Sequence, residues 1–217
     1  MKNLNNILSL RFRYSQWVLL VYILACPLLI FAQTSVSNES EFREAVANGG
    51  NILVKTSFNL SETLEISKDV VLDLGGNILT RSKGERFATD LMGIKCKDGN
   101  ILIKNGTVIT EQTGFGGGYT ACVYIEGGVT TIINSTIKGH SSGFTRDVDA
   151  VHHVGGTLFL VSGTFVGTVS NGGTGYAIES KNQNIADFLK GSLVKKGDAV
   201  QNVEVRKIEG FVTVSPI

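Results

Sequence analysis

Two aspartates in the second half of the chain have the spacing of a shared metal site. Asp147 and Asp149 stand two positions apart in the segment Arg146-Asp147-Val148-Asp149. Side chains with this spacing share one face of an extended strand, so the two carboxylates could hold one Ca²⁺ together. No cysteine–histidine spacing in the sequence is typical of a zinc site. The sequence as a whole predicts no cofactor, and Asp147 and Asp149 are the candidate ligands if Ca²⁺ is bound.

Four stretches between predicted strands carry aromatic and polar residues that could bind a carbohydrate. They occupy residues 81–90, 111–120, 139–149 and 167–176. Exposed aromatic rings can pack on the C–H faces of sugars, whereas charged and amide side chains can bond to hydroxyl groups. Together with two residues of the adjoining strands, the candidate ligand-binding residues are Phe115, Tyr119, Tyr124, Phe144, Arg146, Asp147, Asp149, His152 and Tyr176.

The elements that position these residues follow an internal repeat of about 28 residues. Four similar segments, anchored on Gly106, Ser135, Gly163 and Gly191, follow one another at strides of 29, 28 and 28 residues. Apolar residues alternate within each copy, and a period of two predicts a β-strand. The stride is too short for a propeller blade and lacks the leucine-rich repeat pattern. It predicts a coil in which equivalent residues of parallel strands stack about 4.8 Å apart.

The open start of such a coil needs a cover, because its strand edge is unpaired. Ser40 is expected to cap a short helix over residues 41–48. Phe42, Ala45 and Val46 fall on one face of this helix and can plug the end of the coil.

We expect an all-β chain, a single-stranded parallel β-helix solenoid of about six turns with a short N-terminal capping helix. Residues 203–214 are expected to form a last strand pair that closes the stack. The expected divisions are a signal peptide over 1–32, a linker and cap helix over 33–50, and the β-helix domain over 51–217.

The repeat register also predicts which side chains share a file along the coil. Lys95, Tyr124, His152 and Glu179 form an outward file, which we interpret as a solvated sheet face with charge pairs between turns.

The same register predicts two free, buried thiols. Cys96 aligns with Ile125 and with an inward-facing His153, whereas Cys122 aligns with Ala150. This offset of three positions, about 10 Å along a strand, places the two thiols on opposite faces, too far apart for a disulfide.

The opening segments, 51–60 and 64–80 after an amphipathic helix, resemble the first turns of pectate-lyase-like right-handed β-helix proteins. Later turns that read Gly-Gly-Thr-Leu-Phe-Leu and Ser-Gly-Thr-Phe resemble those of bacterial surface β-helix proteins. The resemblance covers residues 37–217 and implies a right-handed coil. Because this fold hosts lyases, hydrolases, epimerases, adhesins and binding modules, the resemblance leaves the function open.

Polysaccharide lyases of this fold place an acidic Ca²⁺ cluster beside an arginine or lysine that removes the proton next to a uronate carboxylate. The resemblance thus makes Arg146, Asp147 and Asp149 candidate catalytic residues. However, neighbouring turns supply no further acid at that position. Glycosidases of this fold use paired aspartates with Gly-His-Gly, whereas here Gly139-His140 is followed by serine. Catalysis therefore stays an alternative.

The first 32 residues resemble a secretory leader. Three basic residues and no acidic one precede an apolar run over 17–31, which ends at Ala32. We expect cleavage after Ala32 and export to the cell surface, the periplasm or the medium. A retained anchor and lipidation at Cys26, in a lipobox-like sequence, are the alternatives.

These observations favour a secreted or cell-surface β-helix protein that acts as a glycan-binding or adhesive module, with a polysaccharide or another surface glycan as its partner. Removing the leader leaves 17 basic and 19 acidic residues, a net charge of −2, which argues against a nucleic-acid partner. After cleavage no membrane span is expected. Two alternatives stay open: a small polysaccharide lyase acting on uronate-containing glycans, and a purely structural surface element.

Overall fold

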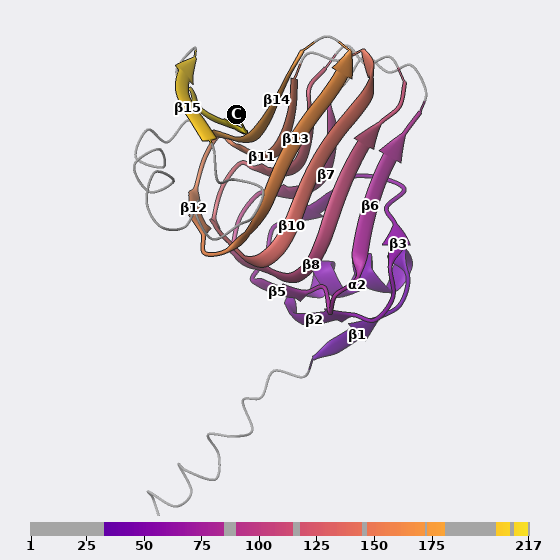
Figure 1. Cartoon of the computed structure of the whole chain (residues 1–217). Helices are drawn as coiled ribbons and strands as arrows, with labels where there is room; N and C mark the ends of the chain where they lie inside the picture. Colours follow the sequence, from indigo (N-terminus) through magenta and orange to yellow (C-terminus); the bar gives the residue numbers. More distant parts are fainter. Residues whose placement is uncertain are drawn as a thin grey trace, which may run out of the picture. The chain divides into compact units, whose positions relative to one another are not determined.

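The chain folds as a parallel β-solenoid of about four turns, as its computed structural model in Figure 1 shows. The described residues are 33–84, 90–114, 118–144, 147–171, 173–180, 203–208 and 211–216. Within them, a single short helix accompanies the strands.

Helix α2 (Glu39–Asn48) covers the first turn, as predicted, but a different residue caps it. Asn38, rather than Ser40, is the N-cap, and its side-chain oxygen accepts a hydrogen bond of 3.0 Å from Glu41 N. Glu41 in turn accepts a bond of 2.7 Å from Ser37 N, so the carboxamide and the carboxylate satisfy two free amides reciprocally. The predicted apolar face is confirmed: Phe42, Ala45 and Val46 are buried.

The first sheet confirms the predicted stacking of turns, since its strands pair in parallel in the order β1-β2-β5-β8-β10-β12, with β3, β6 and β13 alongside. These strands are β1 (Thr34–Val36), β2 (Gly50–Val54), β3 (Phe58–Asn59), β5 (Val70–Asp73), β6 (Ile78–Lys83), β8 (Asn100–Gln112), β10 (Val129–Phe144), β12 (Thr157–Leu160) and β13 (Gly163–Asn171). Ile103, Ile132 and Leu160 occupy equivalent positions on successive turns and are buried.

The second sheet carries the strands that complete each turn. In chain order they are β4 (Leu64–Ile66), β7 (Leu91–Cys96), β9 (Thr120–Ile125), β11 (Asp147–His153), β14 (Thr174–Ser180), β15 (Val203–Ile208) and β16 (Phe211–Pro216). Strands β4 to β14 pair in parallel, each with the strand of the next turn.

The expectation of six turns is wrong, and the coil has about four. Parallel pairing continues only as far as β14, because β16 pairs antiparallel with β14 and β15 antiparallel with β16. The predicted strand pair therefore closes the stack. The further repeat copy expected over 183–193 lies outside the described residues.

Two asparagines shape the long strands β8 and β10, which curve along one side of the coil in Figure 1. Asn105 (φ 59°) and Asn134 (φ 48°) adopt the left-handed conformation, which asparagine tolerates better than most residues. Asn134 donates to Asn105 over 3.2 Å, and Asn105 donates to Asp73 over 3.2 Å. This ladder links three successive turns where the backbone changes direction.

Both cysteines are free and buried, as predicted, but their expected placement on opposite faces is wrong. Cys96 and Cys122 both lie in the hydrophobic core. Strict alternation fails because Cys122 and Val123 are consecutive core residues, and so are Ala150 and Val151 on the next turn. Burial raises the pKa of each thiol to about 12, which makes both thiols unreactive at neutral pH.

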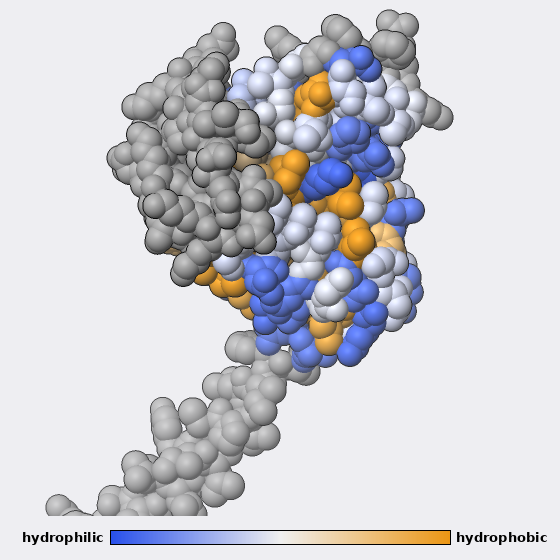
Figure 2. All heavy atoms as spheres, in the orientation of Figure 1, coloured by the Kyte–Doolittle hydropathy of each residue, from blue (hydrophilic) through white to orange (hydrophobic). Residues whose placement is uncertain are grey.

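The outer surface of the coil is not uniformly polar. Figure 2 shows apolar patches between hydrophilic residues on the face that carries β6, β8 and β10. Ile78, Phe159 and Val161, all from the first sheet or its end, are the large apolar residues with exposed side chains among the described residues. No helix in the described part of the chain is long and apolar enough to cross a membrane.

Candidate functional site

The predicted outward file on the second sheet is present. Lys95 pairs in register with Tyr124, Tyr124 with His152, and His152 with Glu179. These four residues come from β7, β9, β11 and β14, one from each successive turn. The expected charge pairs between turns are present, since His152 pairs with Glu179 and Lys95 with Glu126. The face is not solvated throughout, however, because the side chain of His152 is only 10% exposed.

A break in strand alternation brings Asp149 next to this file. Strand β11 pairs with β9 at Asp149–Ala121 and again at Val151–Val123, and the register skips Ala150 between them. Ala150 and Val151 both point into the core, so the alternation of inward and outward side chains is interrupted here. Two residues an odd number of positions apart across this break therefore lie on the same side of the sheet. Asp149 and His152, three positions apart, are therefore neighbours on the outer side.

Three rings pack together around this point. Tyr119 and Tyr124, from one turn, lie with ring centroids 6.1 Å apart, and His152 of the next turn stacks on both. The centroid of His152 is 4.9 Å from that of Tyr119 and 5.3 Å from that of Tyr124, with interplanar angles of 19° and 9°. Lys95 Nζ lies 5.5 Å from the Tyr124 centroid. We call Tyr119, Tyr124 and His152 the aromatic group.

Asp149, His152 and Glu179 form a second set, here named the acid–histidine group. His152 Nδ1 lies 2.7 Å from Asp149 Oδ2 and 3.1 Å from Glu179 Oε2. The side chain of Asp149 is fully buried, and that of Glu179 is 18% exposed. The other carboxylate oxygen of Asp149, Oδ1, is buried and has no hydrogen-bond partner among the described residues.

The two buried members of this group have shifted proton affinities. Burial raises the pKa of the Asp149 carboxyl to about 7, although the hydrogen bond from His152 opposes the shift. Burial alone would lower the pKa of His152, but its bonds to Asp149 and Glu179 outweigh burial and raise this pKa to about 9. At neutral pH the imidazole is therefore protonated, with Nδ1 beside the carboxyl groups of both Asp149 and Glu179.

His153, the neighbour of His152, faces the other way, as predicted. It pairs in register with Ile125, is buried, and its ring lies 2.8 Å from Ser180 Oγ through Nδ1. Burial lowers the pKa of His153, so this histidine is neutral at physiological pH.

Of the nine ligand-binding residues predicted from the sequence, the structure brings together Tyr119, Tyr124, Asp149 and His152. Tyr176 follows on β14 in register with Asp149, and burial raises the pKa of its phenol. The remaining four do not contribute a described side chain to these two groups.

Asp147 lies at the start of β11, where its carboxylate accepts a bond of 2.9 Å from Thr174 N of the next turn. Its predicted partnership with Asp149 on a Ca²⁺ ion stays a prediction. Phe144 ends β10, but its side chain lies outside the described part of the chain, as do Phe115 and Arg146 altogether.

The stretches that join successive turns lie side by side where they are described. Tyr119 N donates to Asp90 Oδ1 over 3.1 Å, and Asn171 donates to the carbonyl of Ser142 over 2.9 Å. The aromatic group thus stands at the edge of this row of connections, on a rigid sheet.

The sequence places Glu179 and Lys95 in the outward file but does not identify either as a site residue. The stride of 27 residues from His152 to Glu179 is the feature that indicates their proximity, since it places them side by side on β11 and β14.

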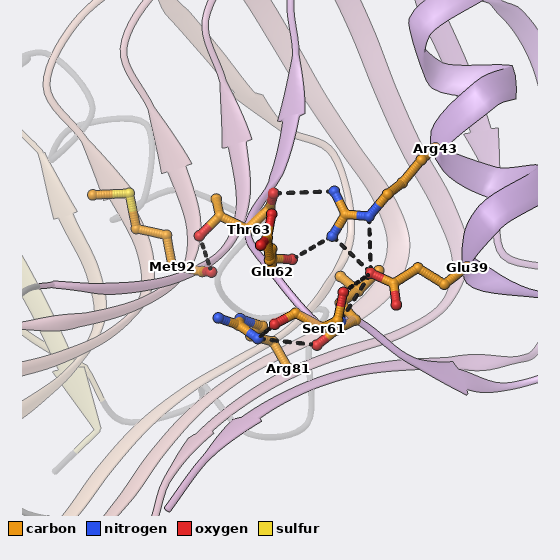
Figure 3. A network of polar contacts seen from close by, with 8 residues as sticks. Glu39, Arg43, Ser61, Glu62, Thr63, Arg81 and Met92 are labelled. Carbon is orange, nitrogen blue, oxygen red and sulfur yellow. Dashed lines mark hydrogen bonds and ion pairs between the residues drawn. The ribbon is translucent and has the colours of Figure 1, made fainter. Parts of the chain in front are cut away.

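A separate polar network lies at the N-terminal end of the coil (Figure 3). Arg43 of α2 donates to Glu39 over 2.8 Å and to the carbonyls of Glu62 and Thr63 over 2.7 and 3.3 Å. Glu39 also accepts bonds of 2.8 Å from the amide and the hydroxyl of Ser61.

Arg81 of β6 completes this set by donating to the carbonyls of Leu60 and Ser61, while its Nε has no partner among the described residues. We call Glu39, Arg43, Ser61, Glu62, Thr63 and Arg81 the N-terminal network. It borders a cavity of about 580 Å³ and fastens the capping helix to the chain between β3 and β4.

Comparison of the chain with protein families, with curated proteins and with solved structures finds no match.

Proposed function

We propose that this protein is an exported or surface-attached β-solenoid that binds carbohydrate at the aromatic group. The observation that carries the proposal is the pair of partly exposed tyrosine rings, Tyr119 and Tyr124, that His152 of the next turn holds side by side. The sequence resemblance suggests a right-handed coil of the pectate-lyase-like kind and a bacterial origin. Both remain part of this proposal.

The chemistry around the rings suits a sugar. Tyrosine has an apolar ring for C–H groups and a hydroxyl for polar contacts, and stacking on His152 limits the conformational freedom lost on binding. Glu179 and Lys95, both partly exposed, supply an acceptor and a donor within the same file. Tyr176 extends the surface along β14 towards the joining stretches.

Export is part of the proposal and rests on the leader-like residues 1–32. Of the two units into which the chain divides, the one that carries the described strands begins at Gln33, directly after the expected cleavage position. Mass spectrometry of the protein exported by its host is expected to find Gln33 at the N-terminus. A start at Cys26 with an added lipid, or an intact leader, would support the alternatives instead.

Glycan-array screening followed by calorimetric titration tests the binding proposal. Tyr119→Ala and Tyr124→Ala are each expected to weaken binding of the best glycan by about tenfold, which corresponds to 1.4 kcal/mol. Phe159→Ala is the matched control, because it removes a 48% exposed ring from β12 in the other sheet. Binding that all three variants leave unchanged would place the ligand elsewhere, and no binding at all would favour a purely structural role.

A polysaccharide lyase is the second candidate, and one observation favours it. A buried carboxyl whose pKa is raised towards 7, in contact with a histidine, is a combination that concentrates in active sites. Incubation with polyuronates would then produce the ultraviolet absorbance of unsaturated uronates, and Asp149→Asn would abolish it. Without such absorbance for the wild type, the lyase candidate is dropped.

A further inference from the structure

We propose that the acid–histidine group binds a divalent transition-metal ion of the Zn²⁺ class. Its three possible ligand atoms are His152 Nδ1, one oxygen of Asp149 and one of Glu179, and all lie within 4.8 Å of one another. Two short strands supply them: Asp149 and His152 come from β11, and Glu179 comes from β14.

The spacing of these atoms is close to that of a metal site. Zinc holds nitrogen and oxygen ligands at 2.0–2.2 Å, so neighbouring ligands of a tetrahedral ion are roughly 3.4 Å apart. Asp149 Oδ2 and Glu179 Oε2 lie 2.7 Å and 3.1 Å from His152 Nδ1, which is closer than the ligands of a bound ion would be. Small side-chain rotations that widen both separations would admit the ion.

A second observation points to a missing ligand. Asp149 has a side chain with no exposed surface, yet its Oδ1 has no hydrogen-bond partner among the described residues. A buried carboxylate oxygen without a partner is costly and uncommon in folded proteins. An ion bound beside this carboxylate would supply the interaction that the protein does not.

The groups that meet here also suit a dication. Two carboxyl groups, one with no exposed surface and one 18% exposed, lie beside a single imidazole nitrogen. A divalent ion held by two carboxylates and a neutral imidazole has a net charge of zero. Because metal ligands must be deprotonated, binding releases the protons that these groups hold.

The surroundings hold the ligand ring in place. Tyr119 and Tyr124 stack on His152, so the direction of its nitrogen is fixed before an ion arrives. Such supporting contacts raise metal affinity, because less ordering remains to be done on binding.

The ligand types select the class of ion. An imidazole nitrogen with two carboxylates suits Zn²⁺ and related transition metals, whereas Ca²⁺ and Mg²⁺ take oxygen ligands. Three protein ligands also leave a fourth position for water or a ligand group. This site uses Asp149 with His152 and Glu179, and thus differs from the Ca²⁺ pair, Asp147 and Asp149, expected from the sequence.

Calorimetric titration of the full chain, stripped of metal with a chelator, tests the inference. Zn²⁺ is expected to bind at one ion per chain, with a heat that depends on the ionisation enthalpy of the buffer because a proton is released. Ca²⁺ is expected to bind at least about tenfold more weakly. Absence of Zn²⁺ binding, or tighter binding of Ca²⁺, would overturn the site.

Three variants locate the ion. His152→Asn and Glu179→Gln are each expected to weaken Zn²⁺ binding by about tenfold or more. His140→Asn, on the other sheet, is the matched control and should bind as the wild type does. If His152→Asn binds Zn²⁺ with wild-type affinity, the ion sits elsewhere and the inference is wrong.

Thermal unfolding supplies a readout that does not depend on a fragile variant. A ligand that binds the folded form raises the melting temperature, so Zn²⁺ should stabilise the wild type and not Glu179→Gln, whose partly exposed amide keeps the shape of the glutamate. An equal rise in both proteins contradicts the site. The inference does not rest on carbohydrate binding. If the protein binds Zn²⁺ but no glycan, only the proposed function is refuted. If it binds a glycan but not Zn²⁺, only the metal site is refuted.

Discussion

At the N-terminal end of the coil, two arginines bond mainly to the backbone, whereas on the second sheet the charged side chains bond to one another. In the N-terminal network, Arg43 and Arg81 donate to main-chain carbonyls, and Arg43 also pairs with Glu39. In the acid–histidine group, one imidazole nitrogen serves two carboxylates, and the buried Asp149 keeps an oxygen without a partner.

This difference indicates that the charges of the N-terminal network hold the fold together, whereas those of the acid–histidine group are arranged in a way that suits a bound ligand. The network joins α2 to the chain between β3 and β4 and lies partly in solvent, so water can replace any bond that is lost. The acid–histidine group joins strands that already pair through their backbones. Its burial adds little to the fold and imposes a desolvation penalty, which a bound ion would offset.

The largest expected effect comes from removing the cation of the acid–histidine group. His152→Leu leaves Asp149 and Glu179 facing each other without a positive charge, and removing one partner of a buried ion pair costs about 3–5 kcal/mol. Urea unfolding at neutral pH with a chelator present measures this loss. In the double variant that adds Asp149→Asn, at least half of the lost stability should return. A loss below about 1 kcal/mol for His152→Leu would mean that the group is not buried as an ion pair.

A smaller effect is expected from raising the pH of the metal-free wild type. The pKa of His152 is raised from an unfolded value of about 6.5 to about 9, so its contribution is complete below pH 6.5 and is lost as pH rises through 9. Between pH 7 and pH 9 the free energy of unfolding should fall by about 2 kcal/mol. Asp149 and Glu179 face the imidazole, and Lys95 lies beyond Tyr124.

The raised pKa of Asp149 acts in the same direction, because here too the folded form binds the proton more tightly. Urea titrations at several pH values give the slope, and His152→Leu is the comparison. If the stability of His152→Leu falls as steeply as that of the wild type between pH 7 and pH 9, another residue is responsible for the pH dependence.

The fold could be predicted from the sequence because its signal is repeated. Ile103, Ile132 and Leu160 recur at a nearly constant stride, and only stacked turns give the same environment to each. The number of turns was not predictable in the same way, since β15 and β16 alternate like any other strands. Nothing in their pattern distinguishes an antiparallel closing pair from further parallel turns.

The sequence could predict some of the residues that lie together at the site, but not how their side chains are arranged. The register of the repeat places Tyr124, His152 and Glu179 in one file. The break in alternation at Ala150 has no sequence signal, and strict alternation would put Asp149 on the face opposite His152. The burial of His152 also depends on Tyr119, which lies before β9 begins and therefore has no place in the strand register.

The smallest expected effect tests the N-terminal network and has the opposite pH dependence. Burial would raise the pKa of Glu39, but its bonds to Arg43 and Ser61 outweigh burial and lower this pKa below its ordinary value. Glu39→Gln should cost no more than about 1 kcal/mol at pH 7, because the pair with Arg43 lies partly in solvent.

A lowered pKa contributes stability above the unfolded value of 4.5, and this contribution is lost as pH falls through the folded value. The deficit of Glu39→Gln in urea unfolding should therefore be constant from pH 7 to pH 9 and shrink as the pH falls below 4.5. Glu44→Gln, exposed on the same helix, is the matched control and should show no deficit. If the deficit of Glu39→Gln instead shrank between pH 7 and pH 9, the network would respond to pH as the acid–histidine group does, and the contrast between the two regions would fail.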